Sequence, residues 1–201
     1  MNRARATTLR VLAAWLFLCP LSASAHLAST GMGALYDGFL HFLLSPEDIV
    51  PVVALAMFAG LRGRAHARAM FALLPASWFV GCLLGTLTGM TPPSWPLPAI
   101  SFLVLGGLVA TDAQLSIRAT ASLAVALGLM HGAMNGAGMR WSFPLLGAYA
   151  GLAAAVLVTA TLISAFVLRL QRPWMRIVMR VAGSWIVASG LLLLGWSLRR
   201  G

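Results

Sequence analysis

The sequence predicts an all-α membrane protein, a polytopic bundle of about six transmembrane helices that follows a cleaved signal peptide. Three observations lead to this prediction. Of the 201 residues, 60% are hydrophobic and only 9% are charged, whereas a soluble domain carries about 25% charged residues. The apolar residues are gathered into stretches long enough to cross a bilayer, and the chain begins with a short basic and then apolar segment. A bilayer therefore has to supply the apolar environment that one small core cannot provide.

The first 25 residues have the three parts of a secretory signal peptide. Three arginines precede residue 11, an apolar run covers residues 11–19, and Ala-Ser-Ala at 23–25 is a small-x-small cleavage site. The apolar run is too short to span a bilayer, although an uncleaved anchor remains the alternative. Cleavage after Ala25 leaves residues 26–201 as a single membrane domain. Its first residue, His26, then has a free amine and an imidazole that together could chelate a metal, or it is simply a frayed terminal residue.

Six later stretches are apolar enough to be membrane spans. A shallow or re-entrant helix over residues 31–44 is expected to precede the first of them. The longest connections between the stretches have about ten residues, so no soluble domain fits between them. The predicted spans cover residues 47–61, 69–89, 97–111, 119–136, 143–168 and 177–198.

The arginines predict the orientation of these spans. Signal cleavage places the mature N-terminus on the outer, periplasmic side of a bacterial inner membrane. Eight arginines then lie in cytoplasmic connections, and only Arg140 and the pair Arg199-Arg200 lie outside, in agreement with the positive-inside rule. The net charge of +10 does not indicate a nucleic-acid partner, because the arginines stand in short runs between apolar stretches and form no patch interleaved with aromatic residues.

Glycines recur at every fourth position in three of the predicted spans. Small residues at this spacing allow helix backbones to approach closely inside a bilayer, where the lipid offers no hydrophobic drive for association. We therefore expect a compact bundle in which these glycines have a packing role. They are Gly81, Gly85 and Gly89 in the second span, Gly128, Gly132 and Gly136 in the fourth, and Gly147 and Gly151 in the fifth.

The first group of polar residues lies around the start of the first span. Asp37 and His41 are one helical turn apart and share a face. The pair Ser45–Pro46 is typical of a helix start with Ser45 as its cap, which puts Glu47 and Asp48 in the first turn. One His and three carboxylates within twelve residues could bind a divalent cation. Alternatively, the acids only complement the helix dipole at a wet interface.

The second group is His131 and Asn135, four residues apart on one face of the fourth span and beside its glycines. Ionisable groups within a span are costly, usually face the bundle interior and are functional candidates. The alternative for His131 is a single hydrogen bond between helices with no further role.

These two groups resemble the motifs of the hydrogenase/urease accessory family HupE/UreJ. The first family motif has a His, five residues and then Asp-His; here His41 is followed after five residues by Glu47-Asp48. The second has the form Phe-His-Gly-x-Ala/Val-His-Gly-x-Glu; here residues 130–138 read Met-His-Gly-Ala-Met-Asn-Gly-Ala-Gly. Relative to the family pattern, two imidazoles and one carboxylate are missing and one carboxylate is added. These exchanges favour harder ions than an imidazole-rich site does.

The resemblance implies a secondary permease that carries a divalent transition-metal ion, nickel or cobalt, into the cell. His41, Glu47 and Asp48 would then capture the ion from outside, and His131 with Asn135 would relay it through the bundle. The transported ion takes the place of a cofactor, and the partners are the bilayer and the ion. A second copy of the chain or an accessory metalloprotein is a further candidate partner.

Two other functions are open to this sequence. A membrane scaffold or accessory protein would have kept the fold and lost the full metal site, as the substituted ligands suggest. A membrane enzyme is not expected, because the sequence has neither a Gly-x-Ser-x-Gly nor a His-Glu-x-x-His pattern.

Overall fold

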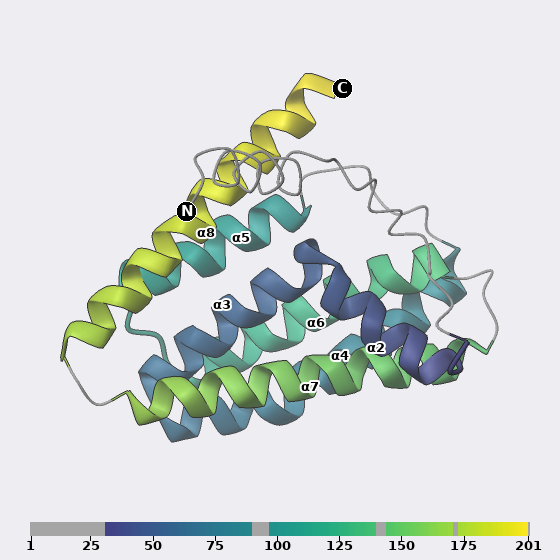
Figure 1. Ribbon diagram of the computed structural model, residues 1–201, viewed down its shortest axis with the longest axis horizontal. Coiled ribbons are helices and arrows are strands. Elements are labelled where there is room, and N and C mark those ends of the chain that lie inside the picture. Colours follow the sequence, from purple (N-terminus) through teal and green to yellow (C-terminus); the bar gives the residue numbers. More distant parts are fainter. Residues whose placement is uncertain (1–30, 90–96, 140–143, 171–172, 201) are drawn as a thin grey trace, which may run out of the picture.

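The computed structural model describes residues 31–89, 97–139, 144–170 and 173–200, and every regular element in these ranges is an α-helix. The predicted all-α class is therefore confirmed (Figure 1). The predicted signal peptide, residues 1–25, and the candidate ligand His26 lie outside the described residues. In chain order the helices are α2 (Ala34–Leu44), α3 (Pro46–Arg62), α4 (Arg64–Thr88), α5 (Leu97–Ala110), α6 (Ile117–Met139), α7 (Leu145–Arg169) and α8 (Pro173–Arg200).

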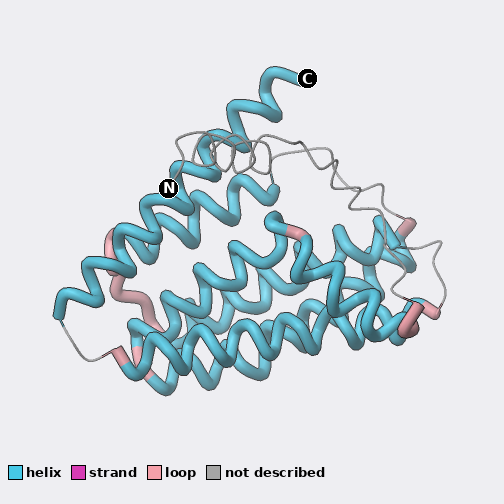
Figure 2. Tube along the Cα trace, in the orientation of Figure 1, coloured by secondary structure: helices cyan, strands magenta, loops and turns pink. Residues whose placement is uncertain are grey.

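Helices α2 and α3 are the two arms of one bent apolar unit. They meet at an angle of 75°, and Figure 2 shows the break as a short loop between them. Pro46 begins α3, as predicted, because a proline lacks the N–H that has no partner in a first helical turn. Ser45 occupies the cap position, but its hydroxyl donates to the carbonyl of His41 at 2.7 Å and makes no capping bond to α3. The predicted side-chain cap is therefore wrong. Ser45 instead donates to a carbonyl in the last turn of α2, which has no backbone partner within the helix.

Within the described ranges, four helices are long and apolar enough to cross a membrane: α4, α6, α7 and α8. The bent α2–α3 pair passes the same test as one unit, which raises the number to five. Helix α5 is apolar but has only 14 residues, fewer than the roughly 20 that a full span needs. The helices α3 to α8 occupy the six predicted stretches, while a count of six spans is not confirmed.

The outward surface of the long helices is apolar. Leu87 on α4, Leu162 on α7 and Leu192 on α8 are each more than 60% exposed. Soluble monomers rarely show large contiguous apolar surfaces, whereas acyl chains are a suitable environment for them. The exposed leucines therefore fit helices that face lipid.

The predicted glycine contacts are formed where α4 packs on α6. A Cβ added to Gly85 would lie 2.0 Å from the carbonyl oxygen of Ala133, and one added to Gly136 would lie 2.0 Å from that of Cys82. These distances leave no room for any side chain, so the two backbones touch as expected. Gly89 departs from the prediction, because it ends α4 in the left-handed region with φ 60°.

Helix α3 occupies the centre of the bundle. It lies between α5 and α7 and contacts both (Figure 1). Nearly all its residues from Val52 to Gly60 are buried. This central position directs Asp48, in the first turn of α3, into the interior, where it is only 4% exposed.

Ion pairs hold together the opposite end of α3. Arg62, in its last turn, donates a hydrogen bond to Asp112 in the α5–α6 connection. Arg176, at the start of α8, places its Nη2 3.1 Å from the other carboxylate oxygen of Asp112. Arg180 donates from Nε to the carbonyl of Ala110 at 2.9 Å. Asp112 is thus a paired acid that joins α3, the α5–α6 connection and α8.

Candidate functional site

Three helices bring polar side chains together in the interior. Asp48 comes from the first turn of α3, His131 and Asn135 from α6, and His41 from the last turn of α2. The four-residue spacing of His131 and Asn135 puts them on one face of α6, as predicted. We call these four residues the polar cluster.

Asp48 is the hub of the polar cluster. Its Oδ1 accepts a hydrogen bond from Nδ1 of His131 at 2.8 Å, and its Oδ2 accepts one from Nδ2 of Asn135 at 2.9 Å. The carboxylate also sits at the N-terminus of α3, where the helix dipole stabilises a negative charge. A buried carboxylate is costly unless it is paired, and here both of its oxygens have partners.

Asn135 connects Asp48 to the second histidine. Its Nδ2 donates to the carboxylate and also to the carbonyl of His131, at 2.9 Å in each case. Both partners are acceptors only, so the amide orientation is determined and Oδ1 points the other way. That Oδ1 lies 3.0 Å from Nε2 of His41, which therefore donates to it. The chain of bonds runs from half-buried His41 through Asn135 to fully buried His131.

His131 is enclosed by two residues that sequence reasoning missed. Its Nε2 lies 3.2 Å from Oγ of Ser101 on α5. The indole of Trp78 on α4 stacks on the imidazole with ring centroids 5.5 Å apart and an angle of 28° between the planes. Phe42 in turn packs its ring against Trp78 in an edge-on contact at 5.8 Å. These contacts fix the plane of the His131 ring.

Only one of the two missed residues had a signal in the sequence. Ser101 is the sole polar residue of α5, and an isolated hydroxyl in a short apolar helix is a candidate for a contact between helices. Trp78 stands in an apolar span where an aromatic residue needs no explanation.

The remaining predicted site residues are not among the four of the polar cluster. Glu47 is exposed, although it is adjacent to Asp48 in the chain. Asp37 is half-buried on α2, one turn before His41. His26 lies outside the described residues. Within the described ranges, no three residues among His, Cys, Asp and Glu are grouped closely enough to hold a metal ion.

The polar cluster contains two imidazoles, one carboxylate and one amide oxygen, although His41, Asp48 and His131 are not close enough in this arrangement for all three to bind one ion. Such nitrogen and oxygen donors suit borderline divalent ions such as Co²⁺ and Ni²⁺, and the carboxylate and amide also suit harder ions. The donors now bind each other, so an ion at Asp48 would replace the hydrogen bonds from His131 and Asn135.

The comparisons with known proteins agree with the motifs. The model of the family described as HupE / UreJ protein matches residues 14–193, which include the whole polar cluster. No curated protein matches the chain, and neither does any solved structure. The family match and the apolar helices together indicate a multi-pass membrane protein. The chain belongs to the HupE/UreJ family.

Proposed function

We propose that this chain is a secondary permease that moves a divalent transition-metal ion, nickel or cobalt, across the bacterial inner membrane into the cell. Its mature N-terminus lies on the periplasmic side. The bent α2–α3 unit and the short α5 together with the four long helices make up the six spans. The polar cluster is the site that the ion passes through.

One observation carries the proposal: the carboxylate of Asp48 is buried among apolar helices together with the side chains of His131 and Asn135. Ionisable groups within membrane bundles are rare and usually belong to ion or proton pathways. His131 and Asn135 follow Asp48 by 83 and 87 positions in the chain, so the fold brings distant segments together here. A bundle held by packing alone has no need of such a cluster, because its glycine contacts already bring the helices together.

The break between α2 and α3 supports the same interpretation. In many transporters, the ion or substrate site lies where a helix is interrupted, with half-helix termini pointing at the ligand. Here the break at Ser45 separates His41 at the end of α2 from Asp48 at the start of α3. Both ends of the interruption therefore contribute a candidate ligand.

Burial suggests the order in which the ion meets these ligands. His41 is half-buried, whereas Asp48 and His131 are buried. An ion arriving from outside would reach His41 first, then Asp48 with Asn135, and finally His131. The membrane potential favours inward movement of a cation by about 2.3 kcal/mol per charge per 100 mV, which gives a driving force without nucleotide hydrolysis.

A scaffold or accessory protein without transport is the second candidate. It is favoured by the completeness of the hydrogen bonds: Asp48, Asn135 and His131 each have described partners on every polar atom of their side chains. A closed network of this kind is able to fix helix positions with no ion present. The two functions differ in one respect, which is whether the protein binds and moves metal.

The proposal is tested by metal accumulation in cells that express the chain. His41→Ala and His131→Ala should each bring nickel and cobalt accumulation down to the level of cells without the protein. Glu47→Gln removes an exposed carboxylate next to Asp48 and should retain most of the accumulation. Membrane abundance of each variant, measured by immunoblot, separates lost transport from lost protein. If both His variants accumulate metal at the parent level, the permease proposal is rejected and the scaffold function replaces it.

A further inference from the structure

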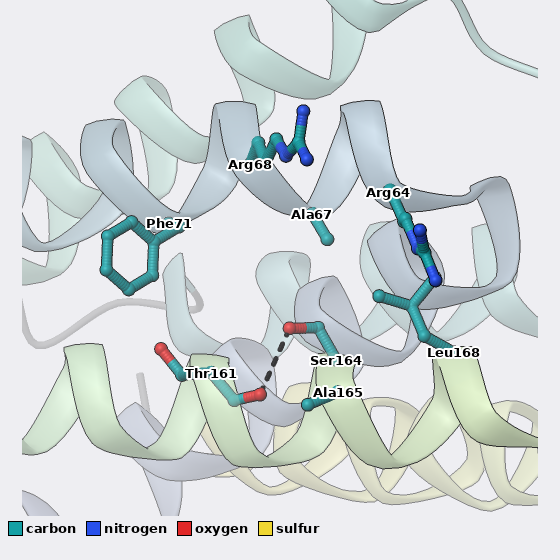
Figure 3. Close-up of a pocket in the computed structure, with 8 residues that line it drawn as sticks. All are labelled: Arg64, Ala67, Arg68, Phe71, Thr161, Ser164, Ala165 and Leu168. Carbon is teal, nitrogen blue, oxygen red and sulfur yellow. Dashed lines mark hydrogen bonds between the residues drawn. The ribbon is translucent and has the colours of Figure 1, made fainter.

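A groove with a volume of about 290 Å³ opens on the surface between the start of α4 and the end of α7 (Figure 3). Two arginines of α4, Arg64 and Arg68, lie at its mouth one helical turn apart. Its apolar lining comes from both helices, with Ala67 and Phe71 on α4 facing Ala165 and Leu168 on α7. The groove is separate from the polar cluster, since it shares no residue with it.

Within the residues that the structure describes, no acidic side chain pairs with either of these two arginines. The chain has four acidic residues, all within the described ranges. The described salt bridges use Asp48 and Asp112, whose partners are His131, Arg62 and Arg176. Arg64 and Arg68 are both exposed and form no described ion pair. An anion at the mouth of the groove would therefore meet the guanidinium of Arg64, which reaches towards α7, and the exposed Arg68 on α4 could turn to join it (Figure 3). Guanidinium groups are strong phosphate donors.

The two hydroxyl groups of the groove have no hydrogen left to donate to an anion. Thr161 donates its hydroxyl hydrogen to the carbonyl of Leu157 at 2.7 Å, and Ser164 donates to the carbonyl of Thr161 at 3.3 Å, the bond that Figure 3 marks. With their hydrogens used within α7, both hydroxyls present lone pairs only. Anion binding thus depends on the arginines, of which Arg64 extends across the groove towards Leu168 on α7 (Figure 3).

The length of the groove along α4 suits a lipid headgroup followed by part of an acyl chain. Arg64 and Phe71 are seven residues apart on a continuous helix, which corresponds to about 10 Å along the helix axis. The charge therefore lies at the end of an apolar helix and the aromatic ring lies further along it, as a headgroup and an acyl chain do. A free phosphate ion would use the arginines but would make no contact with the apolar lining at Phe71 and Ala165.

We propose that this groove binds an anionic phospholipid, with its phosphate at Arg64 and Arg68 and one acyl chain along Ala67, Phe71, Ala165 and Leu168. Basic pockets between membrane helices are suited to anionic headgroups. The site does not depend on metal transport, and it would persist if the chain proved to be a scaffold.

Native mass spectrometry of the full chain, released from detergent micelles, tests the proposal. The micelles contain phosphatidylglycerol and phosphatidylcholine with identical acyl chains. The parent should retain phosphatidylglycerol in preference to phosphatidylcholine. Arg64→Gln and Arg68→Gln should each reduce that preference about five-fold. Arg118→Gln, which removes an exposed arginine at the start of α6, is the matched control and should leave it unchanged.

A second variant tests the groove without changing any charge. Ala165 is exposed within the lining, so Ala165→Trp fills the groove and should lower phosphatidylglycerol retention to a similar extent. Excess inorganic phosphate should not displace the lipid. The proposal is overturned by equal retention of the two lipids, by arginine variants that behave like Arg118→Gln, by full retention in Ala165→Trp, or by displacement with phosphate.

Discussion

Two carboxylates of the described part of the chain, Asp48 and Asp112, are paired with nitrogen donors, and the donors differ. Asp48, at the start of α3, is 4% exposed and binds His131 and Asn135. Asp112 follows α5, close to the end of α3, has a side chain 23% exposed and binds two arginines. The two acids therefore lie near opposite ends of the central helix.

The difference in donors decides what each site can do. Arginine remains protonated and has no acceptor atom, so it can pair with Asp112 but cannot bind a cation. Neutral imidazole and the amide oxygen are metal ligands as well as hydrogen-bond partners. The arginine pairs can thus only hold helices together, whereas the side chains of the polar cluster are of types that can also bind an ion.

The largest expected difference is between Asp48→Asn and Asp112→Asn in metal accumulation. Asp48→Asn removes the one carboxylate of the polar cluster and should reduce nickel and cobalt accumulation to background. Asp112→Asn should retain transport in the protein that reaches the membrane, because Asp112 lies outside the polar cluster and pairs with two arginines. Accumulation normalised to membrane abundance measures both. An equal loss of metal accumulation in the two variants would show that the two sites do not differ in function.

In thermal unfolding in detergent, Asp112 should matter for stability although it does not matter for transport. Asp112→Asn weakens two charged hydrogen bonds and leaves Arg62, whose side chain is 4% exposed, with a poorer partner. We expect a loss of about 1.5–3 kcal/mol. Arg176→Gln removes only the pair with a half-exposed arginine and should cost about 0–1 kcal/mol. A variant Asp112→Asn as stable as the parent would show that the pairs do not hold this end of the bundle.

The position of the polar cluster depends on how closely α6 approaches α4. Gly136 is adjacent to Asn135, and a Cβ there would collide with the carbonyl of Cys82. Gly136→Ala should therefore destabilise the protein by about 1–3 kcal/mol and lower metal accumulation. Gly138→Ala is its control on the same helix, since nothing lies within 4 Å of an added Cβ. Unfolding temperatures that do not distinguish the two variants would contradict the close packing.

Ser101→Ala should have only a small effect on stability. It removes the hydroxyl 3.2 Å from Nε2 of His131 and should cost about 1 kcal/mol. Ser189→Ala, which removes an exposed hydroxyl bonded only within α8, should be neutral in the same unfolding assay. A large loss of metal accumulation in Ser101→Ala, with normal stability, would mean that Ser101 itself contacts the ion.

Local sequence patterns were sufficient to predict most of the fold. Long apolar stretches indicated the positions of α3 to α8, and the four-residue glycine spacing indicated the contact between α4 and α6. The length of α5 was harder to predict, because composition does not distinguish a full span from a shorter buried helix. Gly89 continued the glycine spacing but ends α4, where a left-handed residue is needed instead of a packing contact.

The candidate site was predictable as a set of residues but not as a geometry. The motifs indicated His41, Asp48, His131 and Asn135. They could not show which of the neighbours Glu47 and Asp48 faces inward, since successive helical residues point about 100° apart and both are acids. Partners from other helices, such as Trp78, depend on tertiary packing that no local pattern contains.

Metal binding to the purified chain tests the central claim most directly. In titration calorimetry with Ni²⁺ and with Co²⁺, the parent protein should show a saturable site that Asp48→Asn abolishes and Asp112→Asn retains. Folding of each variant is checked beforehand by circular dichroism. A parent protein without saturable binding, or the same binding in Asp48→Asn, would contradict the assignment of the polar cluster as the metal site.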